Sequence, residues 1–374
     1  MSMLWLLLVL PALGALLLTV FNEFVWPRGR IGARPDGSIS VLIPARNEAM
    51  NIEAAVRSVM SGTVKPDEVI VYDDGSTDST PDILKRLSEE FRELRVENGI
   101  GLPPGWVGKP HACHRLAGFA RGDKLLFLDA DVRLHPEGLQ RILSIFEDYG
   151  AKVVTAVPRQ EMVTFPEKLV MPLLHMTYTS WLPMPLVWKT NDPRFLAANG
   201  QVLAFDRDAY DQVGGFEAIK KEVVDDMAIC RIAKTKKLRV VFADGHFIAT
   251  CRMYRNFREI WEGFSKNLYE GIGAHPIGLV FLVALYIGTF VAPYLGLVSF
   301  AWSQTWGLAA LAGVLANLSL RFVLSIRHGH PFVSALLHPV AVVVLMAIAI
   351  NSWWWNTKGA ISWSGRVYQA KKSR

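Results

Sequence analysis

Cysteines are few in this 374-residue sequence, and acidic residues are absent from residue 277 to the end. Cys113, Cys230 and Cys251 show no CxxC spacing, which argues against a disulfide framework and against a cysteine zinc site. Hydrophobic residues make up 51% of the chain, so a disordered polypeptide is excluded. The composition indicates a folded protein with unusually large apolar segments.

The basic net charge has a local origin. The formal charge is +6, but seven of the 40 Lys and Arg residues follow residue 277, which leaves 33 basic against 34 acidic residues before it. A nucleic-acid-binding protein needs a basic patch on a folded domain. We therefore expect no nucleic acid among the partners.

Three stretches contain no Asp, Glu, Lys or Arg at all, namely 1–22, 277–320 and 331–357. Each is long enough to enter or cross a bilayer. The first lacks the basic start of a signal peptide and its apolar run is too long for one, so we interpret residues 1–25 as a retained transmembrane anchor. Arg28, Arg30 and Arg34 follow it, and the positive-inside rule places the rest in the cytoplasm.

The C-terminal region 277–357 is predicted to hold further membrane segments. The second stretch fits two spans, about 277–300 and 305–325. The third stretch is followed by a basic tail, 358–374, which should also be cytoplasmic, so a single crossing would break the rule. Two interpretations stay open: a re-entrant hairpin bent near His338-Pro339, which we favour, or a tail outside. The protein is thus predicted to be a multi-pass protein of the cell (cytoplasmic) membrane.

Residues 37–250 have the pattern of an α/β domain with a largely parallel sheet. Strands are predicted at Ser40–Pro44, Glu68–Tyr72 and Lys124–Leu128, and helices at Glu48–Met60 and from about Pro136. Short apolar strands that alternate with amphipathic helices are typical of this class.

Acidic residues follow two of these strands. Asp73 and Asp74 end one, and Asp129 and Asp131 end another. In open α/β sheets the ligand crevice lies at the carboxyl ends of the strands, and two carboxylates at i, i+2 can converge on one hard cation. If Asp129 and Asp131 are considered alone, the alternative to a metal site is that a D-x-D pair occurs by chance in a solvated loop.

Six motifs in order and spacing closely resemble the family 2 glycosyltransferases of GT-A fold. They are VLIPARNE at 41–48, VYDDGSTD at 71–78, GKPHAC at 108–113, FLDADV at 127–132, Gly-Gly-Phe at 214–216 and VVDDMAICRIAK at 223–234. The segments GLPPGWVGKPHAC, CRMYRNFREIWEGFSKNL at 251–268 and ISWSGRVY at 361–368 resemble the hopene-associated and carotenoid-acid glycosyltransferases of membranes. The resemblance implies a cytoplasmic GT-A domain, Rossmann-like with a mostly parallel sheet, plus α-helical transmembrane segments.

The resemblance also implies roles for ten residues. Pro44, Ala45, Arg46 and Glu48 would border the nucleotide, Asp74 would hold the base or ribose with Asp73 as its neighbour, and Lys109 would approach the diphosphate. Asp129 would face the ribose beside the metal, Asp131 would ligate Mg²⁺ or Mn²⁺, and Asp226 would be the catalytic base. A UDP-sugar is the donor that the resemblance suggests.

Chemistry supports this set. Departure of a nucleoside diphosphate builds negative charge, which a divalent ion and a lysine stabilise. An acceptor hydroxyl must lose a proton, which a carboxylate can take, and one base without a nucleophile implies inversion. The start of a helix should keep Asp226 ionised. Capping of that helix is the structural alternative for Asp225 and Asp226.

The segment 251–272 alternates basic and aromatic residues, which suggests an interfacial amphipathic helix; an ordinary surface helix is the alternative. The Q-x-x-R-W motif of processive relatives is missing from it, so we expect one sugar per turnover. The predicted function is inverting, metal-dependent transfer of a sugar from a nucleotide sugar to the hydroxyl of a membrane lipid. This lipid would be a terpenoid, hopanoid or carotenoid-like molecule, or a glycolipid precursor. Two alternatives stay open, a polyprenyl-phosphate sugar synthase and a non-catalytic nucleotide-sugar sensor or scaffold.

Overall fold

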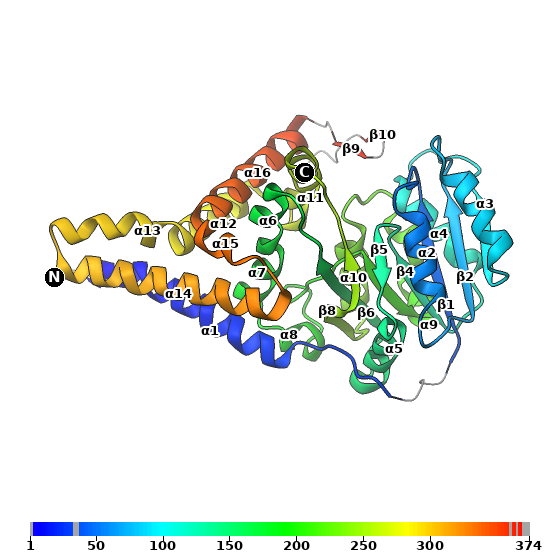
Figure 1. The fold of residues 1–374 in the computed structure, drawn as a ribbon, viewed down its shortest axis with the longest axis horizontal. Helices are drawn as coiled ribbons and strands as arrows, with labels where there is room; N and C mark the ends of the chain where they lie inside the picture. The colour runs from blue at the N-terminus through cyan, green and yellow to red at the C-terminus, as the bar shows by residue number, and fades with distance from the viewer. Residues whose placement is uncertain (1–2, 33–36, 359–360, 364–365, 369–374) are drawn as a thin grey trace. The chain divides into compact units, whose positions relative to one another are not determined.

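The computed structural model describes residues 3–32, 37–358, 361–363 and 366–368 (Figure 1). The chain forms two compact units. The α/β unit comprises Trp26–Glu161 and Pro185–Met253, and the helical unit comprises Met1–Val25, Met162–Met184 and Tyr254–Arg374. The predicted basic tail 358–374 and the motif at 361–368 fall partly outside the described residues.

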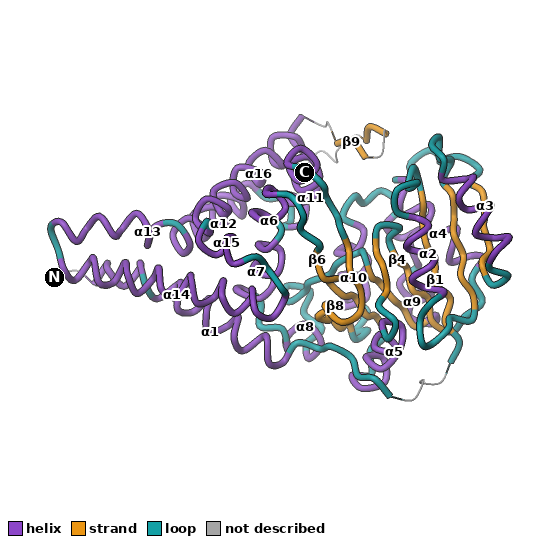
Figure 2. The backbone as a smooth tube through the Cα atoms, viewed as in Figure 1, coloured by secondary structure: helices purple, strands orange, loops and turns teal. Residues whose placement is uncertain are grey.

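The α/β unit is built on an eight-stranded sheet in the order β3-β2-β1-β4-β7-β6-β8-β5, whose strands are drawn in orange in Figure 2. The pairs β1–β2, β2–β3, β1–β4 and β6–β8 are parallel, and β4–β7, β6–β7 and β5–β8 are antiparallel. The strands are β1 Ile39–Ala45, β2 Glu68–Asp73, β3 Leu94–Asn98, β4 Lys124–Leu128, β5 Val132–Leu134, β6 Val153–Gln160, β7 Val202–Asp206 and β8 Val240–Cys251.

Helices cover both faces of this sheet. They are α2 Ile52–Met60, α3 Thr80–Glu90, α4 Gly108–Phe119, α5 Gly138–Tyr149, α8 Pro185–Lys189, α9 Arg207–Val213 and α10 Asp225–Thr235, with a 3₁₀ turn at Gly215–Ile219. Val41 and Ile43 of β1 belong to the core on the side of α2, α3 and α5, whereas Leu42 belongs to the core on the side of α4, α9 and α10. Because side chains alternate along a strand, a strand buried on both faces must be apolar throughout. The predicted α/β class with a mostly parallel sheet is confirmed.

Two local predictions need correction. The helix expected from Glu48 starts at Ile52, because Asn47 adopts a positive φ of 57° and residues 48–51 form a turn first. The helix expected near Pro136 starts at Gly138 and is preceded by β5, which has only three residues. A strand that short carries no recognisable alternation in the sequence.

A bulge in β8 shapes the carboxyl edge of the sheet. The register of β8 with β6 runs from Val153↔Val240 to Pro158↔Gly245 and then jumps to Arg159↔Thr250. The residues between Gly245 and Thr250 therefore have no partner in β6, as is usual for an irregularity of this kind. After the bulge, Cys251 lies opposite Gln160 of β6 and Val132 of β5.

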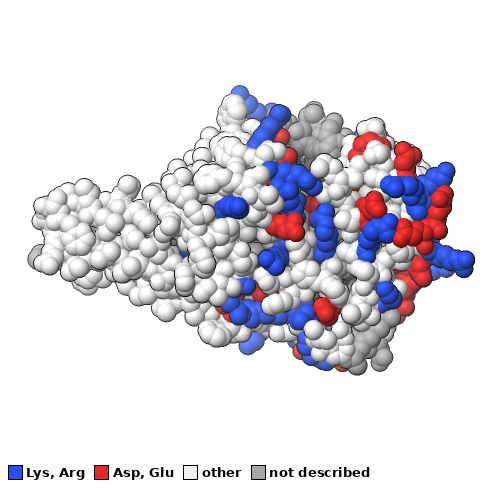
Figure 3. All heavy atoms as spheres, viewed as in Figure 1, with Lys and Arg blue, Asp and Glu red and all other residues white. Residues whose placement is uncertain are grey.

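The helical unit contains the apolar segments. Its helices are η1 Met3–Leu8, α1 Leu10–Val25, α6 Phe165–Val170, α7 Pro172–Trp181, α11 Phe257–Gly271, α12 Pro276–Phe290, α13 Ala292–Gly296, η3 Leu297–Ala301, α14 Gln304–His328, α15 Phe332–Leu336 and α16 His338–Lys358, followed by β9 Ile361–Trp363 and β10 Arg366–Tyr368. Among the described residues, three helical segments are long and apolar enough to cross a membrane, Met3–Val25, Gln304–His328 and His338–Lys358, and the bent pair α11 and α12 would be a fourth if it forms one span. Figure 3 shows no charged side chain on the visible surface around α13 and the adjoining part of α14.

The predicted membrane segments differ from the observed helices in two places. Residues 277–300 do not form one span: α12 has 15 residues and is followed by the short helices α13 and η3, and α12 makes an angle of 115° with α11. The hairpin expected near His338-Pro339 is not formed: α15 ends before Leu337, and residues 338–358 form one continuous helix of 21 residues. At about 1.5 Å per residue, α16 is long enough to span by itself.

Polar contacts tie α1 to the other helices of this unit. Glu23 Oε1 lies 2.9 Å from His328 Nε2, and Arg327 Nε lies 3.4 Å from Glu23 Oε2. Asn22 Nδ2 donates to the carbonyl of Thr179 at 2.8 Å. Asn22, Glu23 and His328 are buried, so their contacts satisfy atoms that would otherwise be costly to keep away from water, whereas Arg327 lies at the exposed edge of this group.

We predict that Gly245→Ala destabilises the α/β unit. A Cβ at Gly245 would lie 2.5 Å from the carbonyl oxygen of Val157, a backbone atom that cannot move without distorting the sheet. The expected cost is about 1–3 kcal/mol, seen as a lower midpoint of thermal unfolding in detergent. Gly118→Ala is the control, because no atom lies within 4 Å of its new methyl group. Equal midpoints for the two variants would contradict the close approach at Gly245.

Candidate active site

The predicted site residues gather at the carboxyl edge of three neighbouring strands. β1 lies between β2 and β4, with Ala45 opposite Asp73 and Leu42 opposite Phe127. Asp73 ends β2, and the loops that follow the three strands carry Arg46 to Asn51, Asp74 to Asp78 and Asp129 to Asp131. Pro44 and Ala45 form the end of β1 itself. Parallel pairing is the reason that residues so distant in sequence share one edge.

Lys109 and Asp129 form the central ion pair. Lys109 Nζ lies 2.6 Å from Asp129 Oδ1 and 2.8 Å from its Oδ2, and it also donates to the carbonyl of Gly200 at 3.3 Å. Burial disfavours the charged lysine, but Asp129 and Asp225 outweigh that effect and raise its pKa. Lys109 is therefore held as a cation at the first turn of α4, and the carboxylate of Asp129 is occupied by it.

Asp131 is arranged differently. Its Oδ1 is buried and has no hydrogen-bond partner among the residues that the structure describes. Burial, Asp129 and Glu48 raise the pKa of Asp131 to about 7, because the carboxylate is shielded from water and close to other negative charge. An unpaired carboxylate oxygen of this kind fits a hard cation, which would also relieve the repulsion.

The prediction of a Mg²⁺ or Mn²⁺ site depends on the unpaired Oδ1 atom of Asp131. Within the described parts of the chain, no group of three His, Cys, Asp or Glu side chains could hold a metal ion. A site of one or two carboxylates is nevertheless the usual arrangement for Mg²⁺, which keeps waters and takes substrate phosphates as its other ligands. Asp131 is the residue that fits, with Asp129 beside it.

Asp226 lies on the other side of Gly200. It is the second residue of α10, and its Oδ1 accepts the backbone N–H of Met227 at 2.7 Å. A methyl group at Gly200 would be 3.3 Å from both Lys109 Nζ and Asp226 Cβ, so Gly200 separates the lysine from the predicted base. Burial and the adjacent Asp225 raise the pKa of Asp226 to about 6, which outweighs the expected effect of the helix start. The group is still mainly ionised at neutral pH.

Three residues predicted to bind the nucleotide sugar, namely Arg46, Asp73 and Glu48, make hydrogen bonds within the protein. Arg46 Nη1 donates to the carbonyl of Asp74 and, at 3.2 Å, to that of Gly75. Asp73 Oδ1 accepts the N–H of Ser76 at 2.9 Å and its hydroxyl at 2.6 Å. Arg46 and Asp73 therefore shape the loop after β2, and the backbone N–H of Asp74 donates to Ala45 at 2.8 Å. Glu48 Oε2 accepts from Asn51 at 2.9 Å.

The family model named Glycosyl transferase family 2 matches residues 40–227, which include every one of these side chains. The chain belongs to glycosyl transferase family 2. It is 26% identical over 348 residues to 4,4'-diaponeurosporenoate glycosyltransferase of Staphylococcus aureus strain bovine RF122 / ET3-1, which covers 90% of each chain. The protein of that name from strain MRSA252 is 25% identical over the same length.

A solved structure shares the fold. It is the mannosyltransferase PcManGT from Pyrobaculum calidifontis, solved with GDP-Man and Mn²⁺, with a TM-score of 0.55 and 18% identity over 92% of this chain and 96% of that one. The likeness shows a GT-A-like fold. This family 2 chain is a glycosyltransferase, as the motifs predict.

Sequence reasoning missed a polar chain behind Asp131. The Cys251 thiol hydrogen-bonds to Asp131, and Gln201 Nε2 donates to Cys251 Sγ at 2.8 Å. Gln160 Nε2 reaches Gln201 Oε1 at 3.3 Å, and the carbonyl of Gln201 accepts the N–H of Asp129 at 3.1 Å. Burial and Asp131 raise the pKa of the Cys251 thiol, so it remains a donor. No spacing in the sequence signals this, because the contact depends on the bulge in β8.

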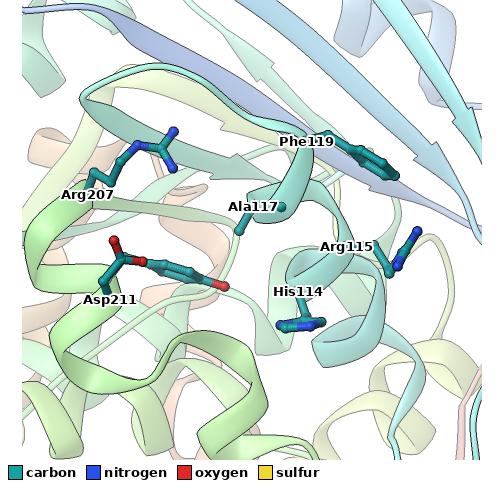
Figure 4. A pocket seen from close by; sticks show the side chains of 8 residues that line it. His114, Arg115, Ala117, Phe119, Arg207 and Asp211 are labelled. Atoms are coloured by element: carbon teal, nitrogen blue, oxygen red, sulfur yellow. The ribbon is translucent and has the colours of Figure 1, made fainter.

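The pocket in Figure 4, of about 320 Å³, lies elsewhere. Residues of α4 and α9 line it, including His114, Arg115, Arg207 and Asp211, and its lining includes no predicted site residue. The N–H of Arg207 donates to the carbonyl of Asp123, which precedes β4. Arg207 is therefore at the amino end of β4, opposite the edge that carries Asp129.

We predict that Asp131→Asn and Asp226→Asn stabilise the metal-free protein at high pH. The folded-state pKa of each acid is raised, so the charged carboxylate destabilises the folded protein once the pH exceeds the unfolded value near 4. The effect grows until the pH reaches the folded value, about 7 for Asp131 and about 6 for Asp226. At pH 8 each variant should gain roughly 1–2 kcal/mol, allowing for partial exposure, and the gain should shrink towards pH 4. Thermal unfolding with EDTA measures this.

Asp78→Asn is the opposite control. Burial works against its charge, but hydrogen bonds from Thr80 and Ala49 dominate and lower the pKa of Asp78. This variant should therefore be less stable than the wild type at pH 8. A loss of stability in Asp131→Asn at pH 8 would show that its charge is favourable and the assignment wrong.

We predict that Cys251→Ala weakens Mn²⁺ binding in the presence of UDP by about 10-fold, because the thiol orients Asp131 so that its other oxygen is free. Cys251→Ser keeps a donor and should stay within about 3-fold of the wild type. Electron paramagnetic resonance of free Mn²⁺ measures the affinity without reference to activity. Equal binding by the alanine and serine variants would mean that the thiol does not position Asp131.

Proposed function

We propose that this chain transfers one sugar, with inversion, from a nucleoside diphosphate sugar to the hydroxyl of a terpenoid-like membrane lipid. The observation that supports it best is the arrangement around Gly200, where the Lys109 cation and the Asp226 carboxylate lie on two sides of one small residue. A cation and a base on two sides of one small residue suit a reaction in which the leaving group lies on one side of the anomeric carbon and the acceptor on the other.

The donor half of the site is formed by Lys109, Asp129 and Asp131. Lys109 would contact the diphosphate and stabilise the charge that develops as the sugar leaves. Asp131, with Asp129 beside it, would hold Mg²⁺ or Mn²⁺, which acts as a Lewis acid on the diphosphate when bound. The solved mannosyltransferase contains GDP-Man and Mn²⁺, which supports both a nucleotide sugar and a divalent ion here. We keep a UDP-sugar as the proposed donor.

The acceptor half is formed by Asp226. A carboxylate that is partly buried and mainly ionised near neutral pH can accept the proton of a hydroxyl as the glycosidic bond forms. A pKa near 6 suits this task better than the pKa of an ordinary aspartate. The carboxylate is then a stronger base, and it is still mainly ionised at neutral pH. No covalent intermediate is needed, and inversion follows.

A lipid acceptor is supported by the helical unit. Three segments are long and apolar enough to cross a membrane, and the Staphylococcus aureus relatives are named for a carotenoid acid. We propose a multi-pass protein of the cell membrane with a cytoplasmic α/β unit, since Arg28 and Arg30 follow α1. The relative's name favours a second candidate, transfer to the carboxylate of a carotenoid-like acid.

The role of Asp226 separates these candidates, because a carboxylate acceptor is already ionised and needs no base. With a lipid alcohol, Asp226→Asn should lower kcat by about 100-fold or more, with little change in donor KM. The rate of the wild type should rise with pH through about 6, because only the ionised carboxylate accepts a proton. Released diphosphate and the glycolipid product measure turnover in detergent.

Asp225→Asn is the matched control. It removes the neighbouring negative charge that raises the Asp226 pKa, so the acid limb should move to lower pH while the rate at pH 8 stays within a few fold. Full activity of Asp226→Asn on a carotenoid acid would favour the second candidate. Metal-dependent nucleotide binding without any transfer would support a sensor instead.

A further inference from the structure

A buried arginine lies within the helical unit. Arg321 of α14 has no exposed surface and is the largest fully buried side chain of the described chain. Its Nη2 donates to Ser334 Oγ of α15 at 2.8 Å. Its Nε and Nη1 are buried and have no hydrogen-bond partner in the described residues. Among the described residues, two of the three guanidinium nitrogens therefore have unfilled hydrogen bonds.

Two more polar groups with unfilled hydrogen bonds lie near it. His338 begins α16, is fully buried, and has no partner on either ring nitrogen within the described chain. The hydroxyl of Tyr294 in α13 is likewise buried without a partner among described atoms. The rings of Tyr294 and His338 are 6.5 Å apart, and Arg321 interacts electrostatically with both. Three helices thus supply hydrogen-bonding groups to one region.

The part of the sequence that carries this cluster contains no acidic residue. No Asp or Glu occurs from residue 277 to the end of the sequence. Glu23 of α1, which contacts the end of α14, is already paired with His328 and Arg327. An unpaired buried cation costs several kcal/mol, and ionisable groups inside membrane helices are usually retained for a ligand or a partner. The cluster is therefore electrostatically incomplete.

We propose that Arg321, Tyr294 and His338 bind the oxyanion of an amphipathic lipid, a carboxylate or a phosphate. A guanidinium is planar and offers several donors at once, which suits either oxyanion, and the phenol and imidazole add two more hydrogen-bonding groups. The ligand is a lipid because α14 and α16 are both apolar enough to cross a membrane. Exposed apolar side chains of the same two helices, such as Phe322, Ile326 and Val340, offer contacts for a hydrocarbon tail. This inference does not rest on the proposed sugar transfer.

The test uses the full chain, delipidated in detergent, and measures binding of radiolabelled palmitate, dioleoylphosphatidate and hexadecanol. The wild type should bind palmitate or phosphatidate saturably and hexadecanol at least 10-fold more weakly, because the alcohol carries no charge. Arg321→Gln should reduce the binding of the acidic lipid at least 10-fold. Arg327→Gln is the matched control, an arginine of the same helix that pairs with Glu23, and should bind as the wild type does.

The probes distinguish the sources of the oxyanion. Palmitate binding alone identifies a carboxylate lipid, and phosphatidate binding alone a phosphate lipid. Competition by inorganic phosphate at equal concentration would overturn the lipid assignment. Equal binding by the wild type and Arg321→Gln, or no binding of either acid, would overturn the proposal and leave water as the partner of these groups.

A stability measurement guards against misfolding. Because Arg321 has no acidic partner among the residues that the structure describes, the delipidated Arg321→Met variant should unfold at the same temperature as the wild type or higher. The acidic lipid should raise the unfolding temperature of the wild type and leave that of Arg321→Met unchanged. A variant that unfolds much earlier, or does not fold, would show that the arginine is a structural residue, which contradicts the proposal.

Discussion

The ion pair between Lys109 and Asp129 is the interaction on which the rest of the active site depends. At 2.6 Å it joins the first turn of α4 to the end of β4, and it occupies the carboxylate of one of the two acids in the D-x-D motif. Asp131 therefore keeps an unpaired oxygen, and its repulsion with Asp129 is tempered but not removed. The lysine also reaches the carbonyl of Gly200, and so connects the donor side with the predicted base.

Close backbone approaches make this arrangement possible. Gly200 leaves room for Lys109 on one side and Asp226 on the other, where any larger side chain would have to displace one of them. Gly245 lets β8 approach β6 before the bulge, and the bulge brings Cys251 to Asp131. Both positions show that the chemistry of the site is fixed by main-chain packing as much as by its charged side chains.

The buried charges that lack a partner have opposite signs in the two units. In the α/β unit, acids are crowded at the edge of the sheet, and the raised pKa values of Asp131 and Asp226 reflect burial first and then repulsion between neighbouring acids. In the helical unit, a guanidinium is buried in a region whose sequence contains no acid after residue 277. In each case burial makes an incomplete set of charges costly, and a ligand of the opposite sign, as proposed above, would complete the set.

The sequence by itself determined the fold class, the family and the edge of the sheet that carries the site, because apolar periodicity, strand ends and motif spacing are local properties. It also predicted roles for Lys109, Asp129, Asp131 and Asp226, which the structure brings to one region. Only the tertiary structure decided which acid is paired, why Arg46 and Asp73 contact their own loops, that Gln201 contacts Cys251, and that Arg321 is buried with unfilled hydrogen bonds. Those facts depend on contacts between residues far apart in the chain, and the register shifts and helix packing that create such contacts leave no local pattern.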